Sequence, residues 1–143
     1  MTGTAGRSKA VATWLAVIGG SLGLHRIYLH GVRDAWAWLY PWPTLIGAYG
    51  FWRMRELGTD DRLGCQLVPL LGVMVAVAML SAIVCGLTSD ERWQVRYGAP
   101  GMPARTGWAT IAGVIVALAI GATVTMATIA FTAQRYFESR APG

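Results

Sequence analysis

Residues 19–31 gather the side chains whose types and spacing could support chemistry in this chain. The segment runs Gly-Gly-Ser-Leu-Gly-Leu-His-Arg-Ile-Tyr-Leu-His-Gly between two apolar stretches. Ser21 and its flanking glycines fit G-x-S-x-G, in which a serine nucleophile needs a preceding strand and later acid and histidine partners. Here the motif ends an apolar helix, and both histidines of the chain follow Ser21 within nine residues. We therefore favour a glycine-thinned helix end over a catalytic serine, and we predict no enzymatic activity.

His25 and His30, with Asp34 one helical turn after His30, are the candidate metal ligands. Two histidines five residues apart do not share one face of a helix, and no H-E-x-x-H motif or cysteine cluster completes a site. We predict no metal and no cofactor. The favoured role is hydrogen bonding at a membrane interface, with Arg26 reaching a phosphate or the carboxyl end of a helix.

The elements that carry this segment are predicted to be membrane helices. The chain is 55% hydrophobic and only 13% charged. Residues 10–24, 35–52, 63–89 and 106–134 lack Asp, Glu, Lys and Arg, and a membrane span needs about 20 mostly apolar residues. We predict an all-α integral membrane bundle of four transmembrane helices. A cleaved signal peptide is the alternative for the first run, but bulky and charged residues follow it instead of a small-residue cleavage site.

The four helices are expected to form two pairs. Residues 8–58 would make an N-terminal helical hairpin, in which Pro41 and Pro43 break the second helix into a piece near 32–40 and a helix over 43–57. Residues 63–138 would make a second helix pair, with a helix over 63–87, a polar loop over 88–105 and a last helix from 107 to 136. Cys65 and Cys85 lie about 30 Å apart on the third helix, too far for a disulfide.

Charge gives the expected partners and sidedness. The formal charge is +5, but the basic residues stand singly at segment ends, where they suit anionic lipid headgroups and not nucleic acid. Seven Lys and Arg residues fall with the two termini and the 53–62 link, against five on the other side. This excess favours both termini in the cytoplasm. Separately, the predicted helix count places Ser8 and Gly98 on opposite faces of the membrane.

Small residues recur every four positions in the last helix, among them Gly113, Ala117 and Gly121. Such stripes let helices approach closely in lipid. We favour packing inside one bundle. An interface with a second copy or with another membrane protein is the alternative. No carboxylate lies within a long apolar run, which argues against an active transporter.

The turn resembles the signature of the TM-two domain, a two-helix membrane hairpin, which reads approximately G-x-x-G-x-[HD]-R-F-Y-x-G. The matching positions are Gly20, Gly23, His25, Arg26, Tyr28 and Gly31, after a basic lead-in of Arg7 and Lys9. The resemblance covers residues 8–58. Ile27 replaces an aromatic residue and His30 precedes the final glycine, and the aspartate that many members place at the end of the second helix is missing.

The resemblance implies a helical integral membrane protein without a clear enzymatic activity. We expect a multi-pass scaffold or accessory protein of the bacterial inner membrane, which works through helix packing and lipid contact at the turn. The alternative function is a small oligomeric channel or transporter. The sequence names no substrate.

Overall fold

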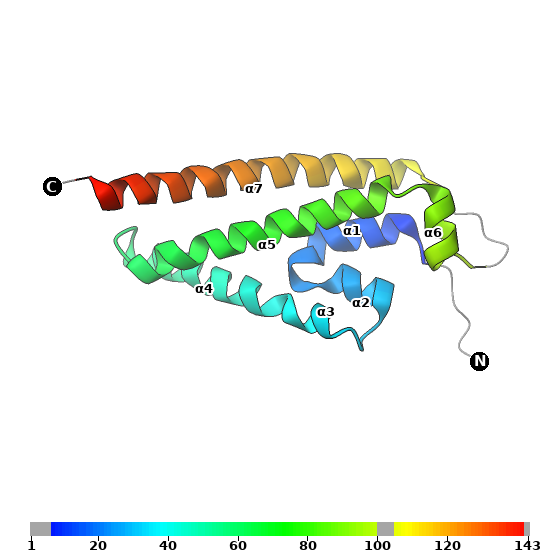
Figure 1. The fold of residues 1–143 in the computed structure, drawn as a ribbon, viewed down its shortest axis with the longest axis horizontal. Helices are drawn as coiled ribbons and strands as arrows, with labels where there is room; N and C mark the ends of the chain where they lie inside the picture. Colours follow the sequence, from blue (N-terminus) through cyan, green and yellow to red (C-terminus); the bar gives the residue numbers. More distant parts are fainter. Residues whose placement is uncertain (1–6, 100–104, 142–143) are drawn as a thin grey trace.

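The computed structural model describes residues 7–99 and 105–141, and all regular elements in these ranges are helical (Figure 1). In chain order they are α1 Lys9–Gly19, the short 3-10 helix η1 Gly20–Leu22, α2 Leu24–His30, α3 Ala35–Leu39, α4 Pro41–Leu57, α5 Arg62–Leu87, α6 Asp90–Tyr97 and α7 Trp108–Arg140. The prediction of an all-α fold is confirmed.

Two long helices, α5 and α7, run side by side along the long axis of the molecule (Figure 1). They contain 26 and 33 residues, which correspond to about 39 and 50 Å at 1.5 Å per residue. Both are long and apolar enough to cross a membrane. Asp61 caps the start of α5, where its Oδ2 accepts a hydrogen bond from the Gly64 backbone N–H at 2.9 Å.

The prediction of four membrane-spanning helices is wrong, because only these two helices in the described ranges are long and apolar enough. Helix α1 has 11 residues and α4 has 17. The chain does not continue across after α1. It turns back through η1 and Gly23, so that Leu29 near the end of α2 packs against Ala12 near the start of α1. The glycines that thin the end of the first apolar run therefore reverse the chain at that point.

Helices α3 and α4 follow the prediction from the prolines. A helical piece at Ala35–Leu39 precedes a second helix that begins at Pro41. Proline is tolerated in the first turn of a helix because the backbone N–H groups there lack intrahelical acceptors. Helix α4 then packs closely on α5, since a Cβ atom on Gly47 would lie 2.5 Å from the Leu71 backbone nitrogen.

The start of α1 lies at the same end of the molecule as α6. The Arg7 backbone N–H donates to the Tyr97 carbonyl oxygen at 3.1 Å. We call this the α6 end. The far end of α7 lies beside the α4–α5 link, where Arg135 Nη2 donates to the Thr59 carbonyl oxygen at 2.5 Å. We call this the α7 end, and Figure 1 shows α6 and the end of α7 at opposite ends of the molecule.

The sidedness expected from the sequence remains a prediction, but the described helices place its residues differently along the molecule. Ser8 and Gly98 were expected on opposite faces, but both lie at the α6 end, next to the hydrogen-bonded pair of Arg7 and Tyr97. The two described chain ends were expected on one face, but they lie at opposite ends of the long axis (Figure 1). The physical reason is the same for both. The α1–α2 hairpin returns to its starting end, where a full crossing had been expected.

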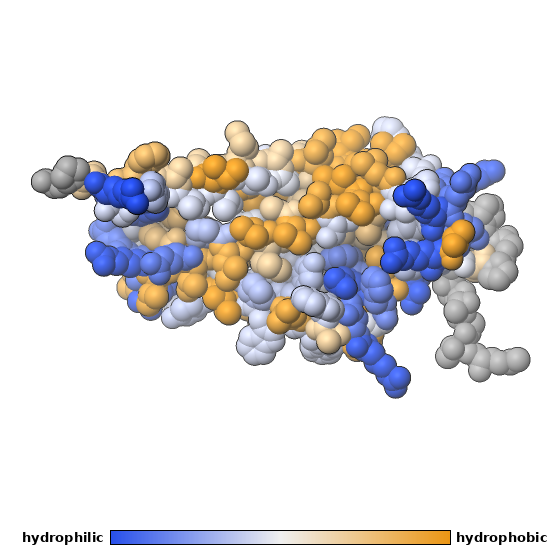
Figure 2. Space-filling view, viewed as in Figure 1, coloured by the Kyte–Doolittle hydropathy of each residue, from blue (hydrophilic) through white to orange (hydrophobic). Residues whose placement is uncertain are grey.

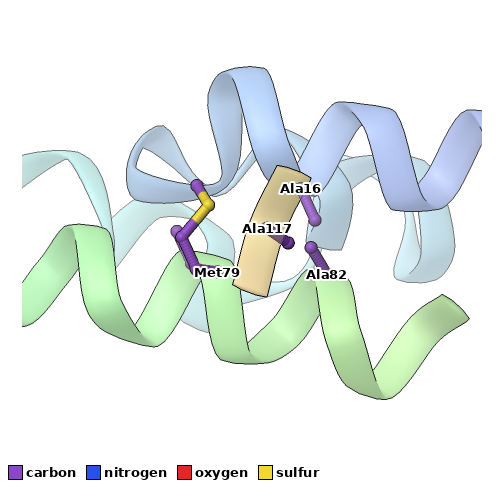
Figure 3. Close-up of a cluster of buried hydrophobic side chains, with 5 residues drawn as sticks. Ala16, Met79, Ala82 and Ala117 are labelled. Atoms are coloured by element: carbon purple, nitrogen blue, oxygen red, sulfur yellow. The ribbon is translucent and has the colours of Figure 1, made fainter. Parts of the chain in front are cut away.

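The core where α1, α5 and α7 meet consists mainly of alanine. Ala16, Ala78, Ala82 and Ala117 are 0–1% exposed and Met79 is 4% exposed. Figure 3 shows Ala16, Ala82 and Ala117 from three helices converging, with Met79 beside them. Small side chains let the three backbones approach closely, so van der Waals contact holds them together.

The surface divides by polarity along the long axis. Figure 2 shows hydrophobic residues over the middle of the molecule and hydrophilic residues gathered at the two ends. Large apolar side chains on α5 and α7 remain exposed, including Leu80, Val84, Ile115 and Leu118. In the most apolar window of each helix only 22% of α5 and 6% of α7 is buried, so most of each apolar window lies on the surface of the molecule.

Candidate functional site

The signature residues 20–31 form the reversal between α1 and α2. Gly23 adopts φ +79°, a left-handed conformation that side-chain-bearing residues rarely take. A Cβ atom there would also lie 2.8 Å from the Ala37 carbonyl oxygen. Gly20 approaches α5, where a Cβ atom would lie 2.8 Å from the Cβ of Ala78. Gly31 ends α2 with φ +87° and has open space around it.

Arg26 connects α2 to the start of α3. Its Nε donates to Asp34 Oδ2 at 3.0 Å, and its guanidinium carbon lies 5.9 Å from the centre of the Tyr40 ring. Asp34 is also the N-cap of α3, because its Oδ1 accepts from the Trp36 N–H at 3.2 Å. Desolvation opposes ionisation of Asp34, but the hydrogen bonds from Arg26 and Trp36 still lower the pKa of its carboxyl group. Arg26 therefore pairs within the protein, and a phosphate is not needed to balance its charge.

His25 is buried behind this pair. It is 4% exposed, and its ring stands edge-on to Tyr40 with the ring centres 5.9 Å apart. Burial, together with the positive charges of Arg26 and His30, lowers the pKa of His25 to about 4. Its Nδ1 has no hydrogen-bond partner among the described residues. The imidazole is consequently neutral at pH 7, the form that burial favours.

Tyr28 ties the end of α2 to the beginning of α1. Arg7 Nε donates to the Tyr28 carbonyl oxygen at 2.7 Å, and the Ser8 backbone N–H donates to the Tyr28 hydroxyl at 3.0 Å. The basic lead-in and the tyrosine of the signature, about 20 residues apart in sequence, thus contact each other. These hydrogen bonds join the end of α2 to the residues that precede α1.

The other candidate residues of the turn do not assemble into a reactive group. The Ser21 carbonyl oxygen accepts a hydrogen bond from Thr44 Oγ1 of α4. His30 stacks edge-on against Tyr97 of α6, with ring centres 6.3 Å apart. Within the described part of the chain, no three His, Cys, Asp or Glu side chains are placed to hold a metal ion.

The small residues of α7 face α1 and α5. A Cβ atom on Gly113 would lie 2.9 Å from Thr13 Cγ2, and one on Gly121 would lie 2.9 Å from Met79 Cβ. Ala117 is 0% exposed within the alanine core. All three therefore contact helices of the same chain.

A second polar cluster, at the α6 end, was not found from the sequence. Lys9 is 5% exposed, and its Nζ donates to Asp90 Oδ1 at 3.0 Å and to Thr106 Oγ1 at 2.7 Å. The Thr106 backbone N–H donates to Asp90 Oδ2 at 3.0 Å. The hydrogen bonds from Thr106 and Lys9 lower the pKa of Asp90 to about 2. This Lys9–Asp90–Thr106 cluster joins the starts of α1, α6 and α7.

Trp93 of α6 completes the contact. It is 2% exposed, packs against Ala12 and Leu29, and donates from Nε1 to the Arg7 carbonyl oxygen at 2.8 Å. Residues 88–105 were expected to form a loop on the face of the membrane opposite Lys9. Ser89 followed by Asp90 and Glu91 is a helix-start pattern that would have revealed α6. No pattern signals that α6 packs on α1.

At the α7 end, Arg53 and Asp61 pair across the α4–α5 link. Arg53 Nε lies 2.6 Å from Asp61 Oδ2. The hydrogen bond from Arg53, helped by the Gly64 N–H, lowers the pKa of the Asp61 carboxyl group. The pair joins α4 to the residue that caps the start of α5.

Comparison of the chain with family models, curated proteins and solved structures finds no match in any of the three. The resemblance to the TM-two domain therefore depends on the six signature residues alone.

Proposed function

We propose that this protein is a non-catalytic integral membrane protein of the TM-two type, a scaffold or accessory protein that works through helix packing and lipid contact. The observation that carries the proposal is the exposed apolar surface of α5 and α7 between two polar ends. Exposed apolar area of this extent is costly in water. In a bilayer it is the surface that contacts lipid.

The contacts inside the turn support a structural role for it. Arg26 is engaged by Asp34, and Tyr28 is engaged by Arg7 and Ser8. A catalytic group needs polar atoms that are free to reach a substrate. Here the polar atoms hold segments of the chain together, which suits a rigid platform for other membrane components.

The distribution of basic residues supports one orientation. Seven Lys and Arg residues belong to the α6 end, namely Arg7, Lys9, Arg26, Arg33, Arg92, Arg96 and Arg105. Five belong to the α7 end, namely Arg53, Arg55, Arg62, Arg135 and Arg140. The positive-inside rule then favours the α6 end in the cytoplasm and the end of α7 on the other face. We propose the bacterial inner membrane as the location.

Alkaline extraction of cell membranes tests the membrane assignment. We expect the protein to stay in the pellet at high pH and to enter solution only with detergent. Release by alkali alone would refute the membrane assignment.

Affinity capture in mild detergent tests the scaffold role. The scaffold role predicts that a membrane-protein partner is captured reproducibly and that Arg26→Ala weakens this capture. Arg33→Ala is the matched control, since Arg33 is exposed and forms no ion pair among the described residues.

The alternative of an oligomeric channel or transporter makes a different prediction. Purified protein in liposomes would then carry ions or small solutes at a rate that empty liposomes lack. We expect no such flux, because no Asp, Glu, Lys, Arg or His occurs between Leu63 and Ser89 or between Thr106 and Gln134. Reproducible flux would overturn the scaffold proposal.

A further inference from the structure

A polar pocket lies at the α7 end, between the first turn of α5 and the last turns of α7. Its volume is about 420 Å³, and its lining includes Thr59, Asp60, Arg62, Gln66, Arg135 and Ser139. Arg62 is exposed and forms no ion pair within the described ranges. Arg135 donates to the Thr59 carbonyl oxygen and to Glu138, and a guanidinium has five donor hydrogens. The pocket therefore offers two permanent positive charges with donors to spare.

An apolar groove of about 360 Å³ lies next to the polar pocket along α5 and α7. Met54 of α4, Pro69 and Gly72 of α5, and Val124, Ala127 and Phe131 of α7 are among the residues that line it. The guanidinium of Arg135 lies 5.6 Å from the centre of the Phe131 ring, so one cation–aromatic contact joins the pocket to the groove. Along α5, Cys65 of the pocket and Pro69 and Gly72 of the groove follow one face at helical spacing.

The groove exists because the α1–α2 hairpin is short. Helix α1 covers α7 as far as Ala117, through contacts of Thr13 and Ala16. Beyond the hairpin tip, where Ile18 is 78% exposed, α7 packs on α5 alone. The side that α1 covers at the α6 end is thus open at the α7 end. Some apolar group must fill it in a bilayer.

We propose that this pocket and groove together bind one anionic phospholipid. Its phosphate lies between Arg62 and Arg135, and one acyl chain occupies the groove over Pro69, Gly72 and Phe131. Between residues 65 and 75 the helix rises about 15 Å, which is the depth of one leaflet of a hydrocarbon core of about 30 Å. Asp60 is the one carboxylate in the lining, and the lining residues sum to one positive charge. Arg135 is paired with Glu138, which lies outside the lining, so Arg62 is the guanidinium that has no carboxylate partner among the described residues. The inference rests on the proposed membrane location.

Native mass spectrometry of the full chain in detergent tests the headgroup. The probes are phosphatidylglycerol and phosphatidylcholine with identical acyl chains. Two basic side chains at headgroup depth predict a preference of about thirtyfold for the anionic lipid. Arg62→Gln should reduce this preference about fivefold, and adding Arg135→Gln should remove it. Arg92→Gln is the matched control, because Arg92 is exposed at the α6 end, and it should leave the preference unchanged.

A groove-filling substitution tests the acyl chain. Ala127→Trp should lower the binding of both lipids, whereas Ala130→Trp, on an exposed position outside the groove lining, should not. Equal binding of the two lipids by the wild type, or equal effects of the two tryptophans, would overturn the proposal. Displacement of the lipid by millimolar inorganic phosphate would make the pocket a phosphate site instead. Alkaline extraction separates these failures from a failure of the membrane assignment, because it does not depend on this site.

Discussion

At the scale of single residues, the reversal between α1 and α2 depends on Gly23. Its left-handed φ of +79° and the Ala37 carbonyl oxygen, 2.8 Å from a would-be Cβ, both exclude a side chain. Gly31 shares the positive φ but faces open space. The two glycines therefore separate the cost of backbone conformation from the cost of a steric clash.

We expect Gly31→Ala to lower the free energy of unfolding by about 1–3 kcal/mol, because its φ of +87° with ψ of 173° lies in a backbone region that is open essentially to glycine alone. Gly23→Ala should cost about 2 kcal/mol or more, because the clash with the Ala37 carbonyl oxygen adds to the cost of a left-handed alanine. Thermal unfolding in detergent, compared with the wild type, measures both. A loss of less than about 1 kcal/mol for Gly23→Ala would mean that the contact with α3 does not constrain the turn.

The buried His25 predicts a pH dependence of stability. Its pKa is about 4 in the folded chain and about 6.5 when unfolded, so the unfolded chain binds the extra proton between these values. The free energy of unfolding should thus be highest above pH 6.5 and fall as the pH decreases to 4, by at most about 3 kcal/mol. Melting temperatures at several pH values check this.

The two histidines provide the control for that experiment. His25→Gln should flatten the pH dependence of the free energy of unfolding between pH 6.5 and 4, because His25 is buried. His30 is exposed, so His30→Gln should preserve that dependence. If the two variants show the same pH dependence, protonation of His25 is not the cause of the loss of stability at low pH.

At the scale of helices, α6 is held to α1 by one charged cluster and one tryptophan. Lys9 is nearly inaccessible, so its charge needs Asp90. Removing one member of a buried pair leaves an uncompensated charge, which costs more than the pair itself contributes. The docking of α6 is therefore sensitive to the charge of a single carboxylate.

Asp90→Asn should loosen α6 and increase proteolysis within α6 several-fold. The substitution keeps the side-chain shape but leaves Lys9 without its counter-charge. Glu91→Gln removes the neighbouring charge on the exposed side of α6 and should have little effect. Limited proteolysis in detergent, followed by mass spectrometry, compares the two, and identical cleavage rates would contradict this role of the cluster.

The packing of α7 on α5 gives a second prediction at this scale. A side chain on Gly121 meets Met79, so Gly121→Leu should destabilise the folded monomer by about 1–3 kcal/mol. Ala119→Leu, on an exposed face of α7, should be nearly neutral. Unfolding curves and the size of the detergent complex distinguish the outcomes. A change of oligomeric state without loss of stability would favour an interface between copies.

At the scale of the whole molecule, the returning hairpin puts the start of the chain and α6 together and the end of α7 opposite. With Cys65 and Cys85 replaced by alanine, single cysteines at Ser8 and Gly98 should react with an impermeant reagent from the same face. A cysteine at Ala141 should react from the other face. Labelling of all three from one face would refute the arrangement in which the α1–α2 hairpin returns to its starting end and α7 ends on the opposite face.

The sequence by itself determined the local features of the fold. Charge-free runs located the long helices α5 and α7, because apolar length is a property of composition. The prolines located the break before α4, and the alanine and glycine spacing marked the faces that pack. The signature residues also identified the turn, because positive φ and close approach restrict those positions to glycine.

Only the tertiary structure decided where the first apolar run leads. Its composition is equally consistent with a crossing helix and with a hairpin that returns, since both bury the same residues. The difference depends on contacts between distant segments, namely Tyr28 with Arg7 and Lys9 with Asp90. No local pattern specifies these contacts, because a hydrogen bond between distant residues leaves no periodicity in the sequence. These contacts hold the α1–α2 hairpin at its starting end. Because the hairpin is short, the groove next to Arg135 stays open.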